Sequence, residues 1–268
     1  MPEIEIPQKI KTMTLPAIIL NPINSILSQE GRSTLGTRAL QSNTLLTFEQ
    51  LGQFSGFILY ETTLPLKFTR DPAILEVRDL RDRALIYVDG DFVGALSREN
   101  YISKLPLSAG YEGSKLSILV ENQGRINFQI ADDYKGIRNG ARIQTFHDTS
   151  ATYQTLANWT ITGFPFEKVV NLESLARISL NYQINSEGIA ADGPTVFHSE
   201  FTIDGEINDT YWDTTDWGKG FVFINGFNLG RYWSIGPQIT IYFPRDILKQ
   251  GKNQIFVVEL QKAPSSFK

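Results

Sequence analysis

An internal repeat constrains the fold of this chain more than any other feature. Residues 85–94 (LIYVDGDFVG) align without a gap with residues 221–230 (FVFINGFNLG), 136 positions later. Each copy is an apolar run, an Asp-Gly or Asn-Gly pair, and a short run that ends in glycine. These pairs favour two-residue hairpin turns, because both central residues of such a turn need positive φ. Each copy predicts a β-hairpin, and two copies predict two β-domains of similar design.

A second match follows each hairpin. Residues 119–121 (LVE) match residues 257–259 (VVE), 138 positions later. Both are the ends of apolar runs that are rich in β-branched residues, which are typical of strands. We therefore expect each hairpin to be followed by a strand that ends in glutamate.

Most of the remaining chain has the texture of short strands. Apolar runs rich in β-branched and aromatic residues lie between Gly, Asp, Asn or Pro, and little helical periodicity separates them. The runs are residues 57–60, 74–77, 84–88, 116–120, 178–182, 195–201, 221–224, 239–243 and 255–258. This pattern excludes a (β/α)₈ barrel and predicts an all-β fold of two β-sandwiches in tandem.

The expected domains are residues 1–48, 49–150 and 151–268. The first range is a lead-in or linker, with a short strand at residues 3–7, a helical stretch at residues 21–29 and an exposed loop at residues 31–43. The other two ranges are the sandwiches. Their boundary is placed in the polar stretch at residues 147–152.

Composition excludes several classes of function. The 268 residues include no cysteine and only two histidines, so thiolate chemistry and His-rich metal centres are excluded. The net charge is −4 and no basic stripe is present, so no nucleic-acid partner is expected. The apolar run at residues 15–20 is too short to span a bilayer, so no membrane partner is expected either.

The sequence marks no catalytic constellation. Many carboxylates are available, but no spacing identifies a pair that would lie about 5–10 Å apart, as glycoside hydrolysis requires. There is no Gly-x-Ser-x-Gly motif. The acidic stretch at residues 204–213 has oxygen ligands for calcium but lacks the Asp-x-Asp-x-Asp-Gly pattern, so a solvated turn is the preferred interpretation.

Residues 231–233 (RYW) allow two interpretations. Exposed Trp and Tyr rings stack on sugars while Asn and Arg bind hydroxyl groups, which makes Arg231, Tyr232 and Trp233, with Asn225, candidates for carbohydrate binding. The preferred alternative is that Tyr232 and Trp233 pack a sandwich edge or a neighbouring domain and Arg231 bridges carbonyl groups.

The same region carries a family resemblance. Residues 218–238 (GKGFVFINGFNLGRYWSIGPQ) closely resemble the end of the glycoside hydrolase family 35 β-galactosidases, the animal lysosomal type included. The match continues through residues 239–244 (ITIYFP) and 253–260 (NQIFVVEL). Residues 47–53 (TFEQLGQ), 56–60 (GFILY), 119–127 (LVENQGRIN) and 133–137 (DYKGI) resemble the family's first β-domain.

The resemblance implies a linker and two galactose-binding-like jelly rolls. In the family, a (β/α)₈ barrel carries both catalytic glutamates and removes terminal β-linked galactose with retention, without a metal or organic cofactor. No catalytic residue, metal ligand or cofactor site is therefore carried over, and the chain alone is expected to be inactive. The implied partners are that barrel and galactosides, and the implied location is lysosomal or extracellular.

One segment is similar to the part of the family that approaches the mouth of the barrel. It is residues 124–128 (GRINF), which makes Arg125, Asn127 and Phe128 candidates for a carbohydrate or barrel interface. Many members of the family have Tyr and then Gly where this chain has Phe128 and Gln129, so that hydroxyl group is missing here.

Three functions are compatible with these observations. The first is a non-catalytic C-terminal portion that packs on a catalytic barrel as a scaffold and assists galactoside binding. The second is a free-standing carbohydrate-binding or lectin-like module, and the third, least favoured, is a complete small hydrolase.

Overall fold

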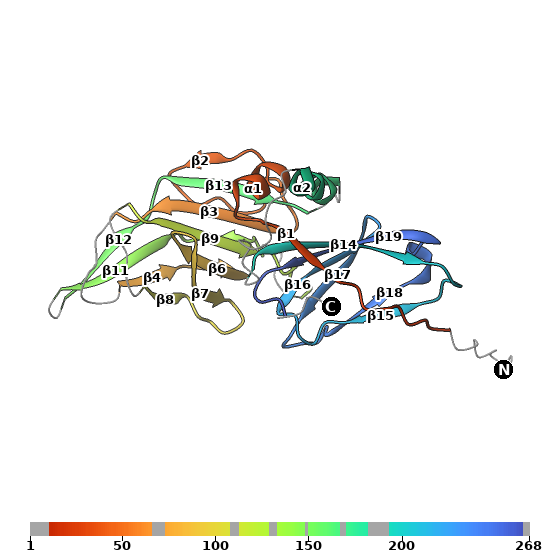
Figure 1. Ribbon diagram of the computed structural model, residues 1–268. Coiled ribbons are helices and arrows are strands. Elements are labelled where there is room, and N and C mark those ends of the chain that lie inside the picture. Colours follow the sequence, from red (N-terminus) through yellow and green to blue (C-terminus); the bar gives the residue numbers. More distant parts are fainter. Residues whose placement is uncertain are drawn as a thin grey trace, which may run out of the picture. The chain divides into compact units, whose positions relative to one another are not determined.

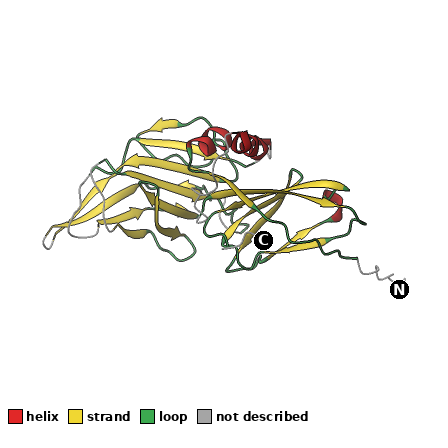
Figure 2. Cartoon of the chain, viewed as in Figure 1, coloured by secondary structure: helices red, strands yellow, loops and turns green. Residues whose placement is uncertain are grey.

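The computed structural model describes residues 11–65, 73–107, 113–128, 133–147, 150–166, 170–181 and 193–264. The chain forms two compact units. Unit 1 contains the described residues of Met1–Leu35 and Lys168–Lys268, and unit 2 contains those of Gly36–Glu167. Antiparallel strands dominate both units (Figures 1 and 2), which confirms the all-β fold. The strand expected at residues 3–7 lies outside the described residues.

Unit 2 contains one large and one smaller sheet. The six-stranded sheet has the order β2 (Leu40–Ser42), β13 (Trp159–Phe164), β3 (Phe57–Thr63), β9 (Lys115–Glu121), β6 (Arg83–Val88) and β7 (Asp91–Ser97). The four-stranded sheet has the order β12 (Ser150–Thr155), β11 (Ala141–His147), β4 (Ala73–Val77) and β8 (Lys104–Leu107). β5 (Leu80–Arg81) pairs with β10 (Gly136–Ile137). Ile86 and Ile118 of the large sheet share one core with Leu75 and Ile143 of the smaller sheet.

Unit 1 is built around a five-stranded sheet. Its order is β1 (Asn21–Ser25), β14 (Thr195–Ile203), β19 (Gly251–Glu259), β16 (Lys219–Ile224) and β17 (Phe227–Trp233). The opposing sheet has only β15 (Thr210–Asp213) and β18 (Thr240–Phe243), and the 3₁₀ helix η2 (Arg245–Ile247) follows. Phe197, Val222 and Val257 share a core with Ile241 and Phe243.

The two predicted hairpins are confirmed. Asp89 and Gly90 have φ of 52° and 95°, and Asn225 and Gly226 have φ of 48° and 90°. The pairing register shifts at equivalent places, between residues 86 and 87 in unit 2 and between residues 222 and 223 in unit 1. Each hairpin lies beside a third strand, β9 or β19, as the repeat predicts.

The strand beside the hairpin is shifted by one residue between the two units. Leu85 pairs with Leu119 in unit 2, whereas its counterpart Phe221 pairs with Val258 in unit 1. The strands therefore correspond at an offset of 139, and the match at 138 is wrong by one residue. A shift of one residue moves side chains to the other face of a sheet.

Because of this shift, Glu121 and Glu259, which the sequence match aligned, do not occupy equivalent positions. Glu259 occupies the position of Val120, on the face that points into the core. Glu121 lies on the opposite face of its sheet, because successive side chains of a strand alternate. Both carboxylates are buried, but they have different surroundings.

The helix expected at residues 21–29 is wrong. Asn21–Ser25 form β1, residues 26–28 form a turn, and α1 (Gln29–Leu35) begins only at the end of the expected range. Pro22 is accommodated because β1 is the edge strand of its sheet, where a missing N–H group costs little. The exposed loop expected at residues 31–43 instead contains most of α1 and all of β2.

The strand expected at residues 178–182 is also wrong. Residues up to Asn181 belong to α2 (Val170–Asn181), and Tyr182 lies outside the described residues. Leu172, Leu175, Ala176 and Ser179 are buried at helical spacing, and the Ser179 hydroxyl donates a hydrogen bond to the Ile23 carbonyl of β1. Tertiary packing therefore overrides the β-branched character of the local sequence.

The two compact units differ from the ranges expected for the domains. His147 of β11 pairs with Ser150 of β12, so the expected boundary falls between two paired strands of unit 2. β13 lies beyond this point and pairs with β3 of unit 2. The lead-in also contributes to a sandwich, because β1 pairs with β14 of unit 1.

Candidate functional site

A buried group of charged side chains lies beneath the loop that carries three of the candidate residues. This charge cluster consists of Arg81, Asp82, Arg98, Asp133 and Lys135. The Lys135 side chain is 1% exposed, and its Nζ lies 2.9 Å from Asp82 Oδ1 and 2.8 Å from Asp133 Oδ2. A buried ammonium group is tolerable because two carboxylates surround it.

Two arginines complete the cluster. Nη1 of Arg98 donates to Asp82 Oδ1 at 3.1 Å and to Asp133 Oδ1 at 2.9 Å, and Nη1 of Arg81 donates to Asp133 Oδ1 at 2.8 Å. Burial alone would raise the pKa of Asp133, but hydrogen bonds from Lys135, the Ile126 N–H and Arg81 hold it far below its usual range. Asp133 therefore stays ionised at neutral pH.

The same carboxylates hold the loop at residues 122–128. The Gln123 N–H donates to Asp82 Oδ2 at 2.9 Å, and the Ile126 N–H donates to Asp133 Oδ2 at 3.3 Å. Nη1 of Arg125 donates to the Asp133 carbonyl at 2.8 Å, and its Nη2 forms an ion pair with Glu49. Charged groups therefore hold this loop at Gln123, Arg125 and Ile126.

The tip of this loop is exposed. Phe128 is 74% exposed, and Arg125 and Asn127 are exposed as well. A polar cleft of about 670 Å³ lies nearby, lined among others by Arg81, Arg98 and Gln123. A large ring, an amide and a guanidinium on a rigid loop are suited to binding another surface or a polar ligand.

Asn225, by contrast, has a structural role, because its side-chain amide forms hydrogen bonds within unit 1. Its Nδ2 donates to the Ile247 carbonyl at 2.9 Å and to Asn253 Oδ1 at 2.7 Å, while its Oδ1 accepts the Gln254 N–H at 3.0 Å. Both ends of the amide thus fasten the hairpin turn to β19 and to η2. The equivalent Asp89 of unit 2 accepts the Lys115 N–H of β9 at 2.7 Å.

The other three candidates alternate across β17. Tyr232 is 0% exposed and its hydroxyl donates to Glu259 Oε2 at 2.8 Å, so its ring is not available to stack on a sugar. Arg231 and Trp233 are half-buried on the opposite face. The Arg231 guanidinium lies 5.1 Å from the centre of the Phe221 ring, and the Trp233 ring lies 4.6 Å from Lys219 Nζ.

The structure therefore divides the seven candidates. Arg125, Asn127 and Phe128 share one exposed loop of unit 2, whereas Asn225 and Tyr232 are structural residues of unit 1. The charge cluster that positions the loop was not identified from the sequence. Asp82, Asp133 and Lys135 are distant in the chain, and no local pattern marks a buried lysine.

The described residues form neither a metal-binding cluster nor a membrane-spanning helix. No group of three or more His, Cys, Asp or Glu side chains that could hold a metal ion gathers among the described residues. In the stretch at residues 204–213, Asp209 accepts the Arg245 N–H at 2.9 Å and the Tyr242 hydroxyl at 2.7 Å. In the described parts of the chain, no helix has the length and apolar character needed to cross a bilayer.

Comparison with known proteins places both units in one family. Residues 46–165 match the family model described as the first all-beta domain of beta-galactosidase, and residues 194–253 match its galactose-binding domain. Beta-galactosidase of Mus musculus is 38% identical over 241 residues, which cover 82% of this chain and 35% of the relative.

Other relatives agree. Beta-galactosidase of Homo sapiens is 36% identical over 244 residues, covering 82% of this chain and 33% of the relative. Beta-galactosidase 17 of Arabidopsis thaliana is 32% identical over 253 residues, covering 86% of this chain and 35% of the relative. The chain thus spans about a third of the length of the curated relatives that it matches.

Proposed function

Because the chain belongs to the β-galactosidase family through its two all-β domains, we propose that it is the non-catalytic C-terminal portion of such an enzyme. The parent enzyme would remove terminal β-D-galactosyl residues with retention. In this proposal the chain is a scaffold that packs on the catalytic barrel and assists galactoside binding. The chain by itself would turn over no substrate.

One observation carries the proposal. The loop at residues 122–128 is exposed at its tip, yet its backbone N–H groups and Arg125 are held by buried carboxylates and by Glu49. An exposed ring on a rigid loop loses little conformational entropy on binding, which is the property of an interface anchor. Phe128 would be that anchor, and Arg125 and Asn127 would be its polar rim.

Complementation tests the proposal. The catalytic barrel of a β-galactosidase relative is expressed with and without this chain, and turnover of a chromogenic β-galactoside is measured. We expect no turnover by the chain alone and a clear gain when barrel and chain are combined. Phe128→Ala in the chain should weaken association about tenfold, the effect of losing ~1.4 kcal/mol at an interface.

A matched variant controls for loss of an exposed ring in general. Phe227, at the hairpin tip of unit 1, is 54% exposed, and Phe227→Ala should leave the complementation unchanged. If the chain neither associates with the barrel nor raises its turnover, the scaffold is excluded and the free-standing carbohydrate-binding module becomes the better interpretation. Robust turnover by the chain alone would overturn both.

A further inference from the structure

The edge strands of the sheets differ in how they are protected against pairing with other strands. An edge strand presents a row of unpaired backbone groups, and proteins usually protect it with a charge, a proline, a bulge or a short length. β8 contains Lys104 and Pro106, and β2 has only three residues. β1, β7 and β17 each carry an extra residue that bulges the strand against its neighbour, namely Ile23, Val93 and Leu229. These five edges are therefore protected.

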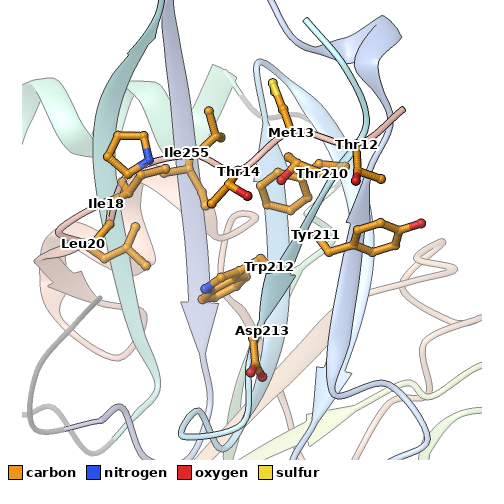
Figure 3. Close-up of a pocket in the computed structure, with 14 residues that line it drawn as sticks. Thr12, Met13, Thr14, Ile18, Leu20, Thr210, Tyr211, Trp212, Asp213 and Ile255 are labelled. Carbon is orange, nitrogen blue, oxygen red and sulfur yellow. The ribbon is translucent and has the colours of Figure 1, made fainter. Parts of the chain in front are cut away.

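The two-stranded sheet of unit 1 is protected in another way. The segment at residues 12–20 runs beside β15 (Figure 3), and the Met13 N–H donates to the Asp209 carbonyl at 2.9 Å. A pocket of about 470 Å³ lies between this segment and β15. β18 has only four residues, and Pro244 follows it directly. β15 is therefore covered, and β18 is short.

β12 has none of these forms of protection. Its six residues (SATYQT) include no charge and no proline, and all six pair in unbroken register with β11. Five of them are exposed, and Gln154 is half-buried. Among the edge strands in the described part of the chain, β12 alone is long, uncharged and regular. An edge of this kind is suited to pairing with another strand.

Every second residue of β12 directs its backbone groups away from β11. The Leu156 N–H, directly after β12, donates to the Ala141 carbonyl of β11 at 3.0 Å. Backbone groups alternate in direction along an antiparallel strand, so those of Ala151, Tyr153 and Thr155 point outward. A further strand matches this row of donors and acceptors group for group.

A partner strand has room to approach this edge. Ala151 and Tyr153 lie on one face of β12 and Ser150 and Thr152 on the other, because side chains alternate along a strand. All four are exposed, so the residues that the structure describes cover neither face of β12. The core begins at the neighbouring strand β11, where Ile143 is 1% exposed. The hairpin of β11 and β12 thus ends unit 2 with an open edge (Figure 1).

We propose that β12 pairs antiparallel with the β12 strand of a second copy of this chain. A two-fold axis perpendicular to the sheet, between the two Tyr153 residues, keeps the same face of the sheet upward in both copies. Ala151 then lies opposite the partner's Thr155. The three facing pairs of outward residues would exchange about six backbone hydrogen bonds, because each such pair exchanges two.

The composition of β12 favours a second copy over an unrelated strand. A two-fold contact brings identical surfaces together, so a charge near the axis would face its own copy. β12 carries no charge, and the two Tyr153 rings would form an aromatic cross-strand pair, which is a stabilising combination. The Arg142 guanidinium lies 4.2 Å from the centre of the Tyr153 ring and is paired with Glu76, so it adds no unbalanced charge.

Sedimentation equilibrium of the whole chain tests the proposal. One pair of strands buries less area than the ~1,200 Å² at which interfaces of standard size begin, so the dimer should be weak, with a dissociation constant of about 10–100 µM. Chain concentrations from about 1 to 500 µM bracket this value. We expect the mean mass to rise from monomer to dimer over this range. A monomer at every concentration would overturn the proposal.

Charged variants show whether β12 meets β12. Ala151→Glu with Thr155→Glu sets like charges opposite each other across the axis and should weaken the dimer at least tenfold, as should Ala151→Lys with Thr155→Lys. An equal mixture of the two variants sets Glu opposite Lys and should recover a dimer. Ala39→Glu with Asn43→Glu is the matched control, because these exposed residues have the same spacing beside β2. The control should dimerise like the unchanged chain.

The outcomes separate this inference from the scaffold proposal. Charged variants that dimerise as tightly as the unchanged chain would show that another surface is used, and a mixture that stays monomeric would show that β12 does not face its own copy. Either result overturns the inference and leaves the scaffold proposal standing. Failure of complementation overturns the scaffold proposal and does not affect the measured dimer.

Discussion

The two repeated hairpins have the same backbone pairing but carry different side chains at one set of equivalent positions. There unit 2 packs three apolar side chains, whereas unit 1 buries a tyrosine and a glutamate next to a glycine. The side chains of unit 2 are all in its core: Ala84, Leu96 and Val120. Their counterparts in unit 1 occupy the same pairing positions: Gly220, Tyr232 and Glu259. One backbone arrangement therefore accepts both an apolar and a polar core.

The polar core depends on a close approach of the backbone. A Cβ at Gly220 would lie 2.5 Å from the Tyr232 hydroxyl and 2.2 Å from the Val258 carbonyl oxygen. The Tyr232 ring thus occupies the space that the Ala84 methyl group fills in unit 2. The glycine is needed here for space, because a larger side chain would displace the ring or the neighbouring strand.

The buried glutamate is satisfied by a cage of local donors. Oε1 of Glu259 accepts the N–H groups of Lys219, Gln261 and Lys262, and Oε2 accepts the Gly218 N–H and the Tyr232 hydroxyl. Burial nevertheless raises the pKa of Glu259, and the donors offset only part of that rise. Unit 2 instead balances its buried carboxylates with cations, and the pKa of Asp133 is lowered.

The largest effect is expected from removing the cation of unit 2. Lys135→Met removes the buried ammonium group that Asp82 and Asp133 share and leaves the partly exposed Arg98 bonded to both, which should destabilise unit 2 by about 3–5 kcal/mol. Hydrogen exchange should report the loss in β9 and leave β19 unchanged. Lys252→Met is the control, because Lys252 is 83% exposed and should change stability by less than ~0.5 kcal/mol. Equal losses in both units would show that their cores are not independent.

Exchanging glycine and alanine at the equivalent positions 220 and 84 should change the stability of the two units by unequal amounts. Gly220→Ala forces a methyl group into the Tyr232 ring and should destabilise unit 1 by about 1–3 kcal/mol. The reverse change, Ala84→Gly, should destabilise unit 2 by only about 0.5–1 kcal/mol, through the flexibility of glycine. Denaturant unfolding of both variants measures the difference. A neutral Gly220→Ala would contradict the spatial role of this glycine.

Removing one donor from the glutamate cage should have a smaller effect. Tyr232→Phe keeps the ring but leaves Oε2 of Glu259 with the Gly218 N–H, at a cost of about 1–2 kcal/mol. Tyr242→Phe also removes a hydroxyl that donates to a carboxylate, but Tyr242 is 44% exposed, so water replaces the bond at little cost. Thermal unfolding of the two variants should therefore differ. Similar losses would refute the distinction between a buried and an exposed tyrosine donor.

The smallest effect is a difference in pH dependence. The raised pKa of Glu259 means that its contribution to the stability of unit 1 is fully present below the unfolded pKa of about 4.3 and is lost as pH rises through the higher folded value. The lowered pKa of Asp133 gives unit 2 the opposite response, because its contribution is lost as pH falls below about 4. Hydrogen exchange measured as the pH rises from about 4 should show a loss of stability in unit 1 that unit 2 does not share. Glu259→Gln should remove that loss.

The hairpins were predictable because a dipeptide encodes a turn. Asp89-Gly90 and Asn225-Gly226 carry their conformation locally, so the repeat identified both sandwiches correctly. The one-residue shift of β19 was not predictable, because Val-Glu occurs in both strands and nothing local specifies which residue pairs with Phe221. The helix α2 differs from β19 in this respect, because Leu172, Leu175 and Ala176 already have helical spacing in the sequence and only the contact with β1 joins distant segments.

The family resemblance pointed to the loop at residues 124–128, but nothing in the sequence pointed to the charge cluster that holds this loop. Lys135 and Asp82 are 53 residues apart, and they meet only in the folded unit. Side chains such as Tyr232 were ambiguous because an aromatic residue in a strand faces either the core or solvent, and the choice depends on register. The sequence therefore predicts turns better than the partners of buried polar groups.

Unit 1 is built from two stretches of chain that flank unit 2 in the sequence, and this has a consequence for folding during synthesis. Its first strand, β1, hydrogen bonds to a partner that follows the whole of unit 2, and Ser25 meets Pro194 across 169 residues. At a ribosomal rate of about 5–20 residues per second, β1 waits roughly 10–30 s for that partner, while unit 2 emerges complete and can fold first. A ribosome that stalls between the two stretches would leave a finished inner unit beside an unpaired strand, which is a ready substrate for chaperones or for aggregation.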